Sequence, residues 1–472
     1  MRMASISLIL VGLFAGGLSS QLAGHAAEQR PVSAAGRLGS VERAEASKVI
    51  GTYCGGCHNG VMRSPSGALL DRFDTATMAD NPETWTRAYR QIQAGTMPPV
   101  GAPRPDRPAY DALLASIEAA LGADAAPPAD ASGREIADRL AWLLWDSAPD
   151  ASLLQDAQQD RLKSPTTLER QITRMINDER AAAFVSRFFF PWLGLDQLGK
   201  ADPDPKYFPE YDVALRDAMA RETELFLLSQ LREDRDPIEL WNANYTFLNE
   251  QLARHYGLPG ITGAQFRRVA LSTPERVGLL GQGSVLMMTS RLQHGQTAGY
   301  TSPAARAVWV RMHFLGAIPP RPFPNAQPVK PELPTTPQTR TLPAEPCVNC
   351  HRNFFPLGYA LENFDPIGRW RTHDQIGPVD ASGSFVDGTP TNGVVALRDV
   401  LLRRPDAFRT TITEKLVVYA SGKPVNGSLM APDTLIRARQ ILHSATPPRW
   451  SSIIAALVSM KSKPGEPAAA VR

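Results

Sequence analysis

The chain has 472 residues, of which 43% are hydrophobic and 21% are charged, a composition typical of a globular protein. Its 50 Lys and Arg residues nearly balance its 47 Asp and Glu residues, and the formal charge of +3 gives no support for binding to nucleic acid or to an anionic membrane surface. The length predicts about three domains.

The first 26 residues have the pattern of a signal peptide. Arg2 supplies a positive charge, and an apolar run from Ile6 to Leu18 follows it. Small residues before and at Ala26 then offer a cleavage point. The run is short for a bilayer span, and an uncleaved membrane anchor is the alternative. In either case we expect the rest of the chain to be periplasmic or otherwise exported, attached to a membrane only peripherally if at all.

Two segments carry the motif C-x-x-C-H, which is the attachment signature of c-type haem. Its members are Cys54, Cys57 and His58 in the first copy and Cys347, Cys350 and His351 in the second. Two thiols three positions apart can form thioethers to both vinyl groups of one porphyrin, and the histidine that follows them reaches the iron. All four cysteines of the chain lie in these motifs. The sequence therefore predicts two covalently bound haem c groups, with the two histidines as iron ligands.

Zinc binding and dithiol redox chemistry are the other common uses of C-x-x-C. A tetrahedral zinc site built from both pairs would require segments about 300 residues apart to meet, and it would leave the two histidines unexplained. A thioredoxin-like pair normally follows a strand in a βαβ unit, and no such unit is visible. Haem is therefore the favoured prediction at both motifs.

Residues 36–125 read as a first domain of three helices. The first helix, Ser40–Tyr53, runs directly into the first motif. A second helix begins near Pro82 and stops at Gly95, and a third follows with its apolar side chains on one face. This order resembles a small class I cytochrome c domain. The resemblance implies that Met97, in the loop between the last two helices, is the sixth iron ligand opposite the histidine. The alternative is that Met97 is a core methionine.

Residues 132–318 read as an α-helical middle domain. Apolar side chains recur at helical spacing, and no sustained period-two alternation is present. The aromatic run Phe188–Leu193 is expected to pack in the core. His255, at a helix end, is expected to be a packed histidine. His294 lies in a glycine-containing loop and is the better candidate for a role near haem, although a structural role is favoured for it too.

A proline-rich linker, residues 319–346, precedes a second haem-binding domain at 347–472. This domain is expected to be mostly helical, with a short hairpin near 379–388. Helices over 408–422 and near 453–460 close the chain. The predicted fold class is therefore mainly α.

Several blocks of the chain resemble a family of secreted multidomain cytochromes assembled from domains of unknown function. The blocks are Ala141–Asp150 (family pattern YFLWSS-x-PD), Asn244–Glu250 with Leu252–Gly257, Thr301–Pro303 with Arg306, Leu357–Arg371 (GFALENFD-x-IGRWR) and Phe408–Gly422 (EKLLTYALGR). The chain departs from the fourth pattern with Tyr359 where Phe is usual. The resemblance implies haem binding and says little about any substrate.

Two arginines in the fourth block invite a functional interpretation. Arg369 and Arg371 alternate, so on an extended strand their guanidinium groups would face the same way and could pair with haem propionates. An ion pair with Asp365 or Asp374 is an equally favoured alternative.

The sixth ligand of the second haem is left open by the sequence. Its candidates are Met430, His373, His443, Met460 and His294, with Met430 leading because it lies in a loop beside a proline, as Met97 does. If this iron had an open position, Tyr359, His294 or His373 could act as acid–base groups in peroxide or oxygen chemistry.

Three functions are compatible with these predictions. The first is electron transfer between the two haems and a redox partner protein, such as a cytochrome or a membrane quinol or oxidase component. The second is an enzyme, a dihaem peroxidase, oxidase or dehydrogenase with its chemistry at the haem of His351. The third and weakest is a scaffold whose haems stabilise the fold. The first is the predicted function.

Overall fold

The computed structural model describes residues 40–61, 68–70, 75–124, 126–127, 129, 131–290, 301–317, 355–374, 377–426 and 431–460, all within a compact unit that covers residues 37–472. The predicted signal peptide and the linker at 319–346 lie outside the described residues, as does the second C-x-x-C-H motif. The described part is mainly α-helical, with two small antiparallel sheets. Of the described helices, none is long and apolar enough to cross a membrane.

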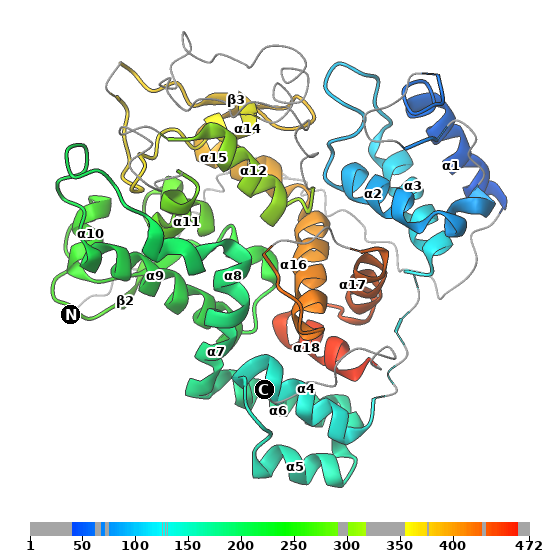
Figure 1. Cartoon of the computed structure of the whole chain (residues 1–472), viewed down its shortest axis with the longest axis horizontal. Coiled ribbons are helices and arrows are strands. Elements are labelled where there is room, and N and C mark those ends of the chain that lie inside the picture. The colour runs from blue at the N-terminus through cyan, green and yellow to red at the C-terminus, as the bar shows by residue number, and fades with distance from the viewer. Residues whose placement is uncertain are drawn as a thin grey trace, which may run out of the picture. The chain divides into compact units, whose positions relative to one another are not determined.

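The amino-terminal part consists of three helices that pack on one another (Figure 1). They are α1 (Ser40–Tyr53), α2 (Pro82–Gln93) and α3 (Arg107–Leu121), with the 3-10 helix η1 (Thr75–Asp80) before α2. All three predicted helices are confirmed. Local signals explain their ends, because α2 starts on a proline at its first position and the Asp106 side chain caps α3 by accepting from the Ala109 N–H. The shared core includes Ile50, Trp85 and Ile117.

The middle part is a succession of helices and short helical turns. They are α4 (Gly133–Trp145), α5 (Ala151–Gln158), η2 (Arg161–Lys163), α6 (Pro165–Asn177), η3 (Glu179–Ala181), α7 (Ala182–Phe184), the π-helix η4 (Val185–Phe189), α8 (Phe190–Leu193), η5 (Leu195–Lys200), α9 (Val213–Arg232), η6 (Pro237–Leu240), α10 (Glu250–Tyr256), η7 (Pro274–Arg276), η8 (Leu279–Gly281), α11 (Gly283–Met288) and α12 (Pro303–His313). Ser132 and Glu135 form a capping box at the start of α4.

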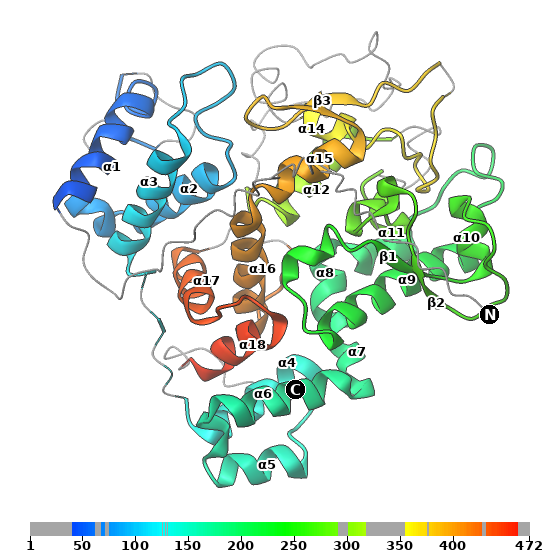
Figure 2. The ribbon, with the colours of Figure 1, turned by 180° about the vertical axis from the view of Figure 1, so that it is seen from behind.

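The middle part also contains a two-stranded sheet that the helical pattern did not predict. Strands β1 (Tyr245–Leu248) and β2 (Arg267–Ala270) pair antiparallel, with Tyr245 opposite Ala270. Strand β1 packs on α9 (Figure 2).

The predicted packing of the aromatic run is confirmed. Phe188, Phe189 and Trp192 are fully buried and contact one another, with ring centroids 4.9–6.1 Å apart. They belong to a hydrophobic core that also takes in the closing helices, because Phe189 packs edge-on against Trp450.

The carboxy-terminal part contains the predicted closing helices and a short hairpin, whose second strand begins after the predicted segment 379–388. Strands β3 (Ser382–Ser384) and β4 (Pro390–Asn392) pair antiparallel after the short helix α14 (Phe355–Tyr359). Four helices follow: α15 (Gly393–Leu402), α16 (Pro405–Ala420), α17 (Pro432–Ser444) and α18 (Trp450–Ser459). Helix α17 packs against both α16 and α18 (Figures 1 and 2).

Candidate functional site

The first C-x-x-C-H motif forms a tight turn at the end of α1. The backbone N–H groups of Cys54 and Gly55 both donate to the Ile50 carbonyl at 2.9 Å, which continues the helix. Those of Cys57 and His58 then donate to the Cys54 carbonyl at 3.1 and 2.9 Å. The turn therefore keeps the two cysteines and the histidine together on one short, hydrogen-bonded segment.

The two cysteines of this turn are free thiols. Cys54 is half-buried, whereas Cys57 is exposed. Burial, with a smaller contribution from the neighbouring Cys57, raises the pKa of the Cys54 thiol to about 11. Free thiols are what thioether formation with a porphyrin requires.

The ring of His58 is oriented by a backbone carbonyl. Its Nδ1 lies 3.3 Å from the Ala68 carbonyl oxygen, and the Leu70 N–H donates to the His58 carbonyl at 2.6 Å. Because a carbonyl only accepts hydrogen bonds, this contact uses Nδ1 as the donor, and in the neutral ring Nε2 is then the nitrogen with the lone pair. Metal-bound histidines commonly use their second nitrogen in this way. Asn59 supports the turn by donating from Nδ2 to the carbonyls of Gly55 and Gly56, at 2.9 Å each.

Met97 lies in a loop whose backbone is held by side chains of its own domain. The Tyr110 hydroxyl donates to the Met97 carbonyl at 3.1 Å. Arg104 donates to the Gly95 carbonyl at 3.1 Å and also to the Pro98 carbonyl. The Met97 side chain is partly buried but is not part of the hydrophobic cluster of this domain, in which Met78 is fully buried. These observations favour an iron ligand over a core methionine.

The residues present at this site fit a haem. Besides two free thiols, an oriented histidine and a loop methionine, the site has solvent-exposed apolar side chains. Val61, three residues after the histidine, is 91% exposed, Leu69 is 58% exposed, and Val100 beside the Met97 loop is also exposed. An apolar macrocycle can cover such side chains, which are otherwise costly to leave in water.

The predicted residues of the second site are only partly described. Cys347, Cys350 and His351 lie outside the described residues, as do His294 and Met430. The two arginines nearby are engaged by carboxylates of the chain. Arg369 binds Asp365 at 3.0 Å, as the ion-pair alternative predicted, and Glu210 at 2.6 Å.

Arg371 bonds to a different acidic residue from the two that were predicted. It lies 3.4 Å from the Glu362 carboxylate and donates to the Glu362 carbonyl at 2.9 Å. Glu362 also forms a fully buried ion pair with Arg306 at 3.0 Å. Direct pairing of Arg371 with a haem propionate is therefore disfavoured.

The other candidate ligands and acid–base groups have different environments. His373 is exposed, Tyr359 and Met460 pack in the core, and His443 lies 2.9 Å from Glu118. His255 is a packed histidine, as predicted, with its Nε2 2.8 Å from the Ile367 carbonyl. Burial lowers the pKa of His255.

Two buried charge clusters between the amino-terminal helices and the closing helices were not predicted. In one, Glu118 on α3 accepts from Tyr89 and Arg439 as well as from His443. In the other, Arg90 on α2 pairs with Glu414 on α16. In most of these contacts the two residues are more than 300 positions apart in the sequence, so no local sequence pattern could reveal the clusters.

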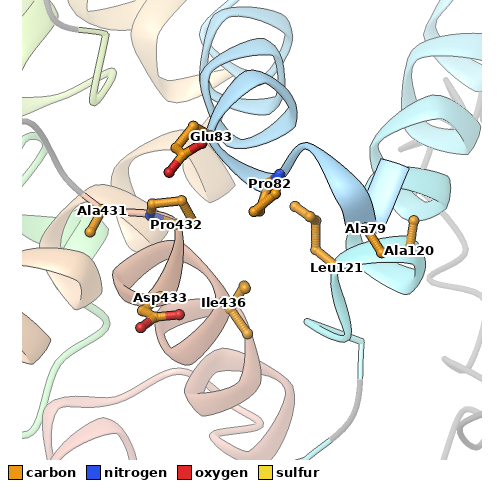
Figure 3. Close-up of a pocket in the computed structure, with 9 residues that line it drawn as sticks. All are labelled: Ala79, Pro82, Glu83, Ala120, Leu121, Ala431, Pro432, Asp433 and Ile436. Carbon is orange, nitrogen blue, oxygen red and sulfur yellow. The ribbon is translucent and has the colours of Figure 1, made fainter. Parts of the chain in front are cut away.

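A cavity of about 410 Å³ lies where the start of α2 and the end of α3 meet the start of α17 (Figure 3). Its lining residues are Ala79, Pro82, Glu83, Ala120, Leu121, Ala431, Pro432, Asp433 and Ile436. None of them is a predicted haem ligand, so this cavity is separate from the candidate site.

Comparison with known proteins gives three family matches, all to proteins of unknown function. They are DUF1592 at residues 132–258, DUF1588 at 276–374 and DUF1585 at 387–428. These domains are associated with multidomain proteins of the cytochrome c type, which confirms the resemblance at that level. No curated protein and no solved structure matches the chain.

Proposed function

We propose that this chain, which carries three domains associated with cytochromes c, is an exported dihaem c-type cytochrome that transfers electrons. One observation carries the proposal. The Nδ1 of His58 bonds the Ala68 carbonyl and leaves Nε2 for an iron, on the same turn as two free thiols.

Each residue of the first site has a defined part in this proposal. Cys54 and Cys57 would attach the porphyrin, while His58 and Met97 would be the protein ligands of its iron. A bound haem of this kind supplies a one-electron couple. Two side chains as iron ligands would leave no position for a substrate, so we assign this site to electron transfer alone.

We propose that the second site takes part in the same electron-transfer path. Cys347 and Cys350 would attach its haem, and His351 would bind its iron. The duplicated motif supports this assignment. The external partner would be a redox protein, either a cytochrome or a quinol or oxidase component of the membrane, met outside the cytoplasm.

The test is a visible spectrum of the chain produced with a haem-maturation system, oxidised and reduced, with and without carbon monoxide. We expect two covalent haems per chain, one of which is lost in C54A/C57A and the other in C347A/C350A. Substitution of Met97 by Ala should remove the far-red band of a methionine-bound iron.

Carbon monoxide separates the electron carrier from an enzyme. Unchanged reduced spectra mean that both irons are saturated, as an electron carrier requires. A shift confined to the haem lost in C347A/C350A would contradict pure electron transfer and point to chemistry at the His351 site. Absence of covalent haem, in a strain that matures a control cytochrome, would refute the whole proposal.

A further inference from the structure

The second half of α2 runs antiparallel to α16. The end of α2, which leads into the Met97 loop, therefore lies near the start of α16. Arg90 pairs with Glu414, in contacts that include Nε to Oε1 at 3.2 Å. One turn later, Gln93 Nε2 donates to Thr410 Oγ1 at 3.2 Å. Later residues of α2 therefore contact earlier residues of α16. The loop that follows α2 therefore meets the residue that precedes α16.

That residue is Arg404, and its guanidinium group lies against Gly95. A Cβ at position 95 would lie only 2.9 Å from Arg404 Cζ, and Gly95 has a φ of +72°. The backbone conformation therefore favours glycine, and a larger residue at position 95 would also have to displace the arginine head group. Arg104 and Tyr110 hold the same loop by hydrogen bonds to its backbone carbonyls.

Arg404 is fixed by a carboxylate of the same carboxy-terminal part. Its Nη2 donates to Asp387, and the guanidinium lies 5.2 Å from the centre of the Phe385 ring. The Nε of Arg404 is buried without a hydrogen-bond partner among the described residues. Asp387 also accepts from the N–H and the hydroxyl of Thr389. The pair is thus largely buried, and its guanidinium group lies beside the Met97 loop.

We propose that the Arg404–Asp387 pair tunes the reduction potential of the haem held by His58 and Met97, acting as a positioning and charge-setting pair from the domain that follows the second motif. This inference rests on the proposed function, because it assumes that the first motif carries haem. It goes further by assigning control of the first haem to residues about 290 or more positions away from it in the sequence.

The physical reason is electrostatic. An oxidised haem carries one more positive charge than a reduced haem, so a nearby cation favours reduction and a nearby anion opposes it. Arg404 lies against Gly95 of the loop with a side chain that is only 20% exposed, so water and salt screen its charge less than that of a fully exposed residue. The positive end of the α16 dipole adds to its effect. Asp387 offsets part of this charge. Removing one member of the pair therefore leaves the other uncompensated.

The test uses the full chain with covalent haem and measures the midpoint potential of the His58 haem together with its methionine–iron band. We expect R404Q to lower the potential and D387N to raise it, with the band retained in both. The double variant R404Q/D387N should return close to the wild-type value. Opposite shifts are the signature of charge, because loss of methionine ligation would lower the potential in every variant.

The matched control is a second ion pair on the same helix. Arg409 of α16 binds Asp236, and both side chains are about as exposed as those of Arg404 and Asp387. R409Q and D236N should leave the potential unchanged, and Asn keeps the oxygen at 236 that accepts from the Ile238 N–H.

Equal potentials in R404Q, D387N and the wild type would overturn the inference, as would shifts of the same sign. If R404Q fails to accumulate, the D387N variant alone tests the proposal. A midpoint potential that does not rise in D387N contradicts it. These outcomes differ from failure of the proposed function, which would appear as a wild-type chain without haem at the first motif.

Discussion

Removing the carboxylate of Glu414 should loosen the contact between α2 and α16. Its side chain is 1% exposed, and that of its partner Arg90 is 9% exposed. The E414A variant would leave the Arg90 guanidinium buried without its anion. Breaking a buried ion pair in this way costs about 3–5 kcal/mol, because the remaining charge keeps its desolvation penalty. Urea unfolding should show this as a clear fall in the midpoint.

An exposed ion pair in the same part of the chain provides the control. Arg107 and Asp111 pair on α3 with side chains that are 63% and 53% exposed. D111A should cost about 0–1 kcal/mol. The double variant R90M/E414L removes both buried charges and should recover much of the stability lost in E414A. The reasoning is refuted if E414A unfolds at the same urea concentration as D111A.

Three further predictions follow from single residues. G95A should destabilise the fold by about 1–2 kcal/mol and weaken the methionine–iron band, because alanine resists the positive φ and meets Arg404; an unchanged band and urea midpoint would contradict this. Y110F removes the hydrogen bond to the Met97 carbonyl and should lower the temperature at which the band disappears; loss of the band at the wild-type temperature would show that this bond does not hold the loop. Burial raises the pKa of Glu222 to about 7, despite hydrogen bonds from Thr246 and Tyr256 that lower it, so the native chain holds this proton where the unfolded chain has released it. Stability should therefore fall as pH rises from about 4.5 to 7, by about 1.4 kcal/mol per unit from this group, and E222Q should remove that part of the pH dependence in urea unfolding.

The helices beside the candidate site were predictable because their signals are local. Pro82 marks the start of α2, and Gly95, two residues after Gln93, marks where the helix has ended. Both ends of α2 could therefore be predicted from the sequence. The sheet of β1 and β2 was missed because each strand has only four residues. So short a segment, such as Tyr245–Leu248, cannot show sustained alternation.

The chemistry-bearing residues of the first site were likewise predictable, whereas their supports were not. The spacing of the motif identifies Cys54 and His58, but the partner of the histidine ring is a backbone carbonyl at Ala68, which has no sequence signature. The contact of Arg404 with Gly95 joins positions more than 300 residues apart. Such contacts arise from the packing of α2 on α16 and become visible only in the folded chain.

The most direct test of the account is the intact mass of the exported chain after maturation. The account predicts a mass that exceeds the polypeptide by two haems, and by one haem in either C54A/C57A or C347A/C350A. A chain recovered at the bare polypeptide mass with four titratable thiols, from cells that mature a control cytochrome, would contradict it.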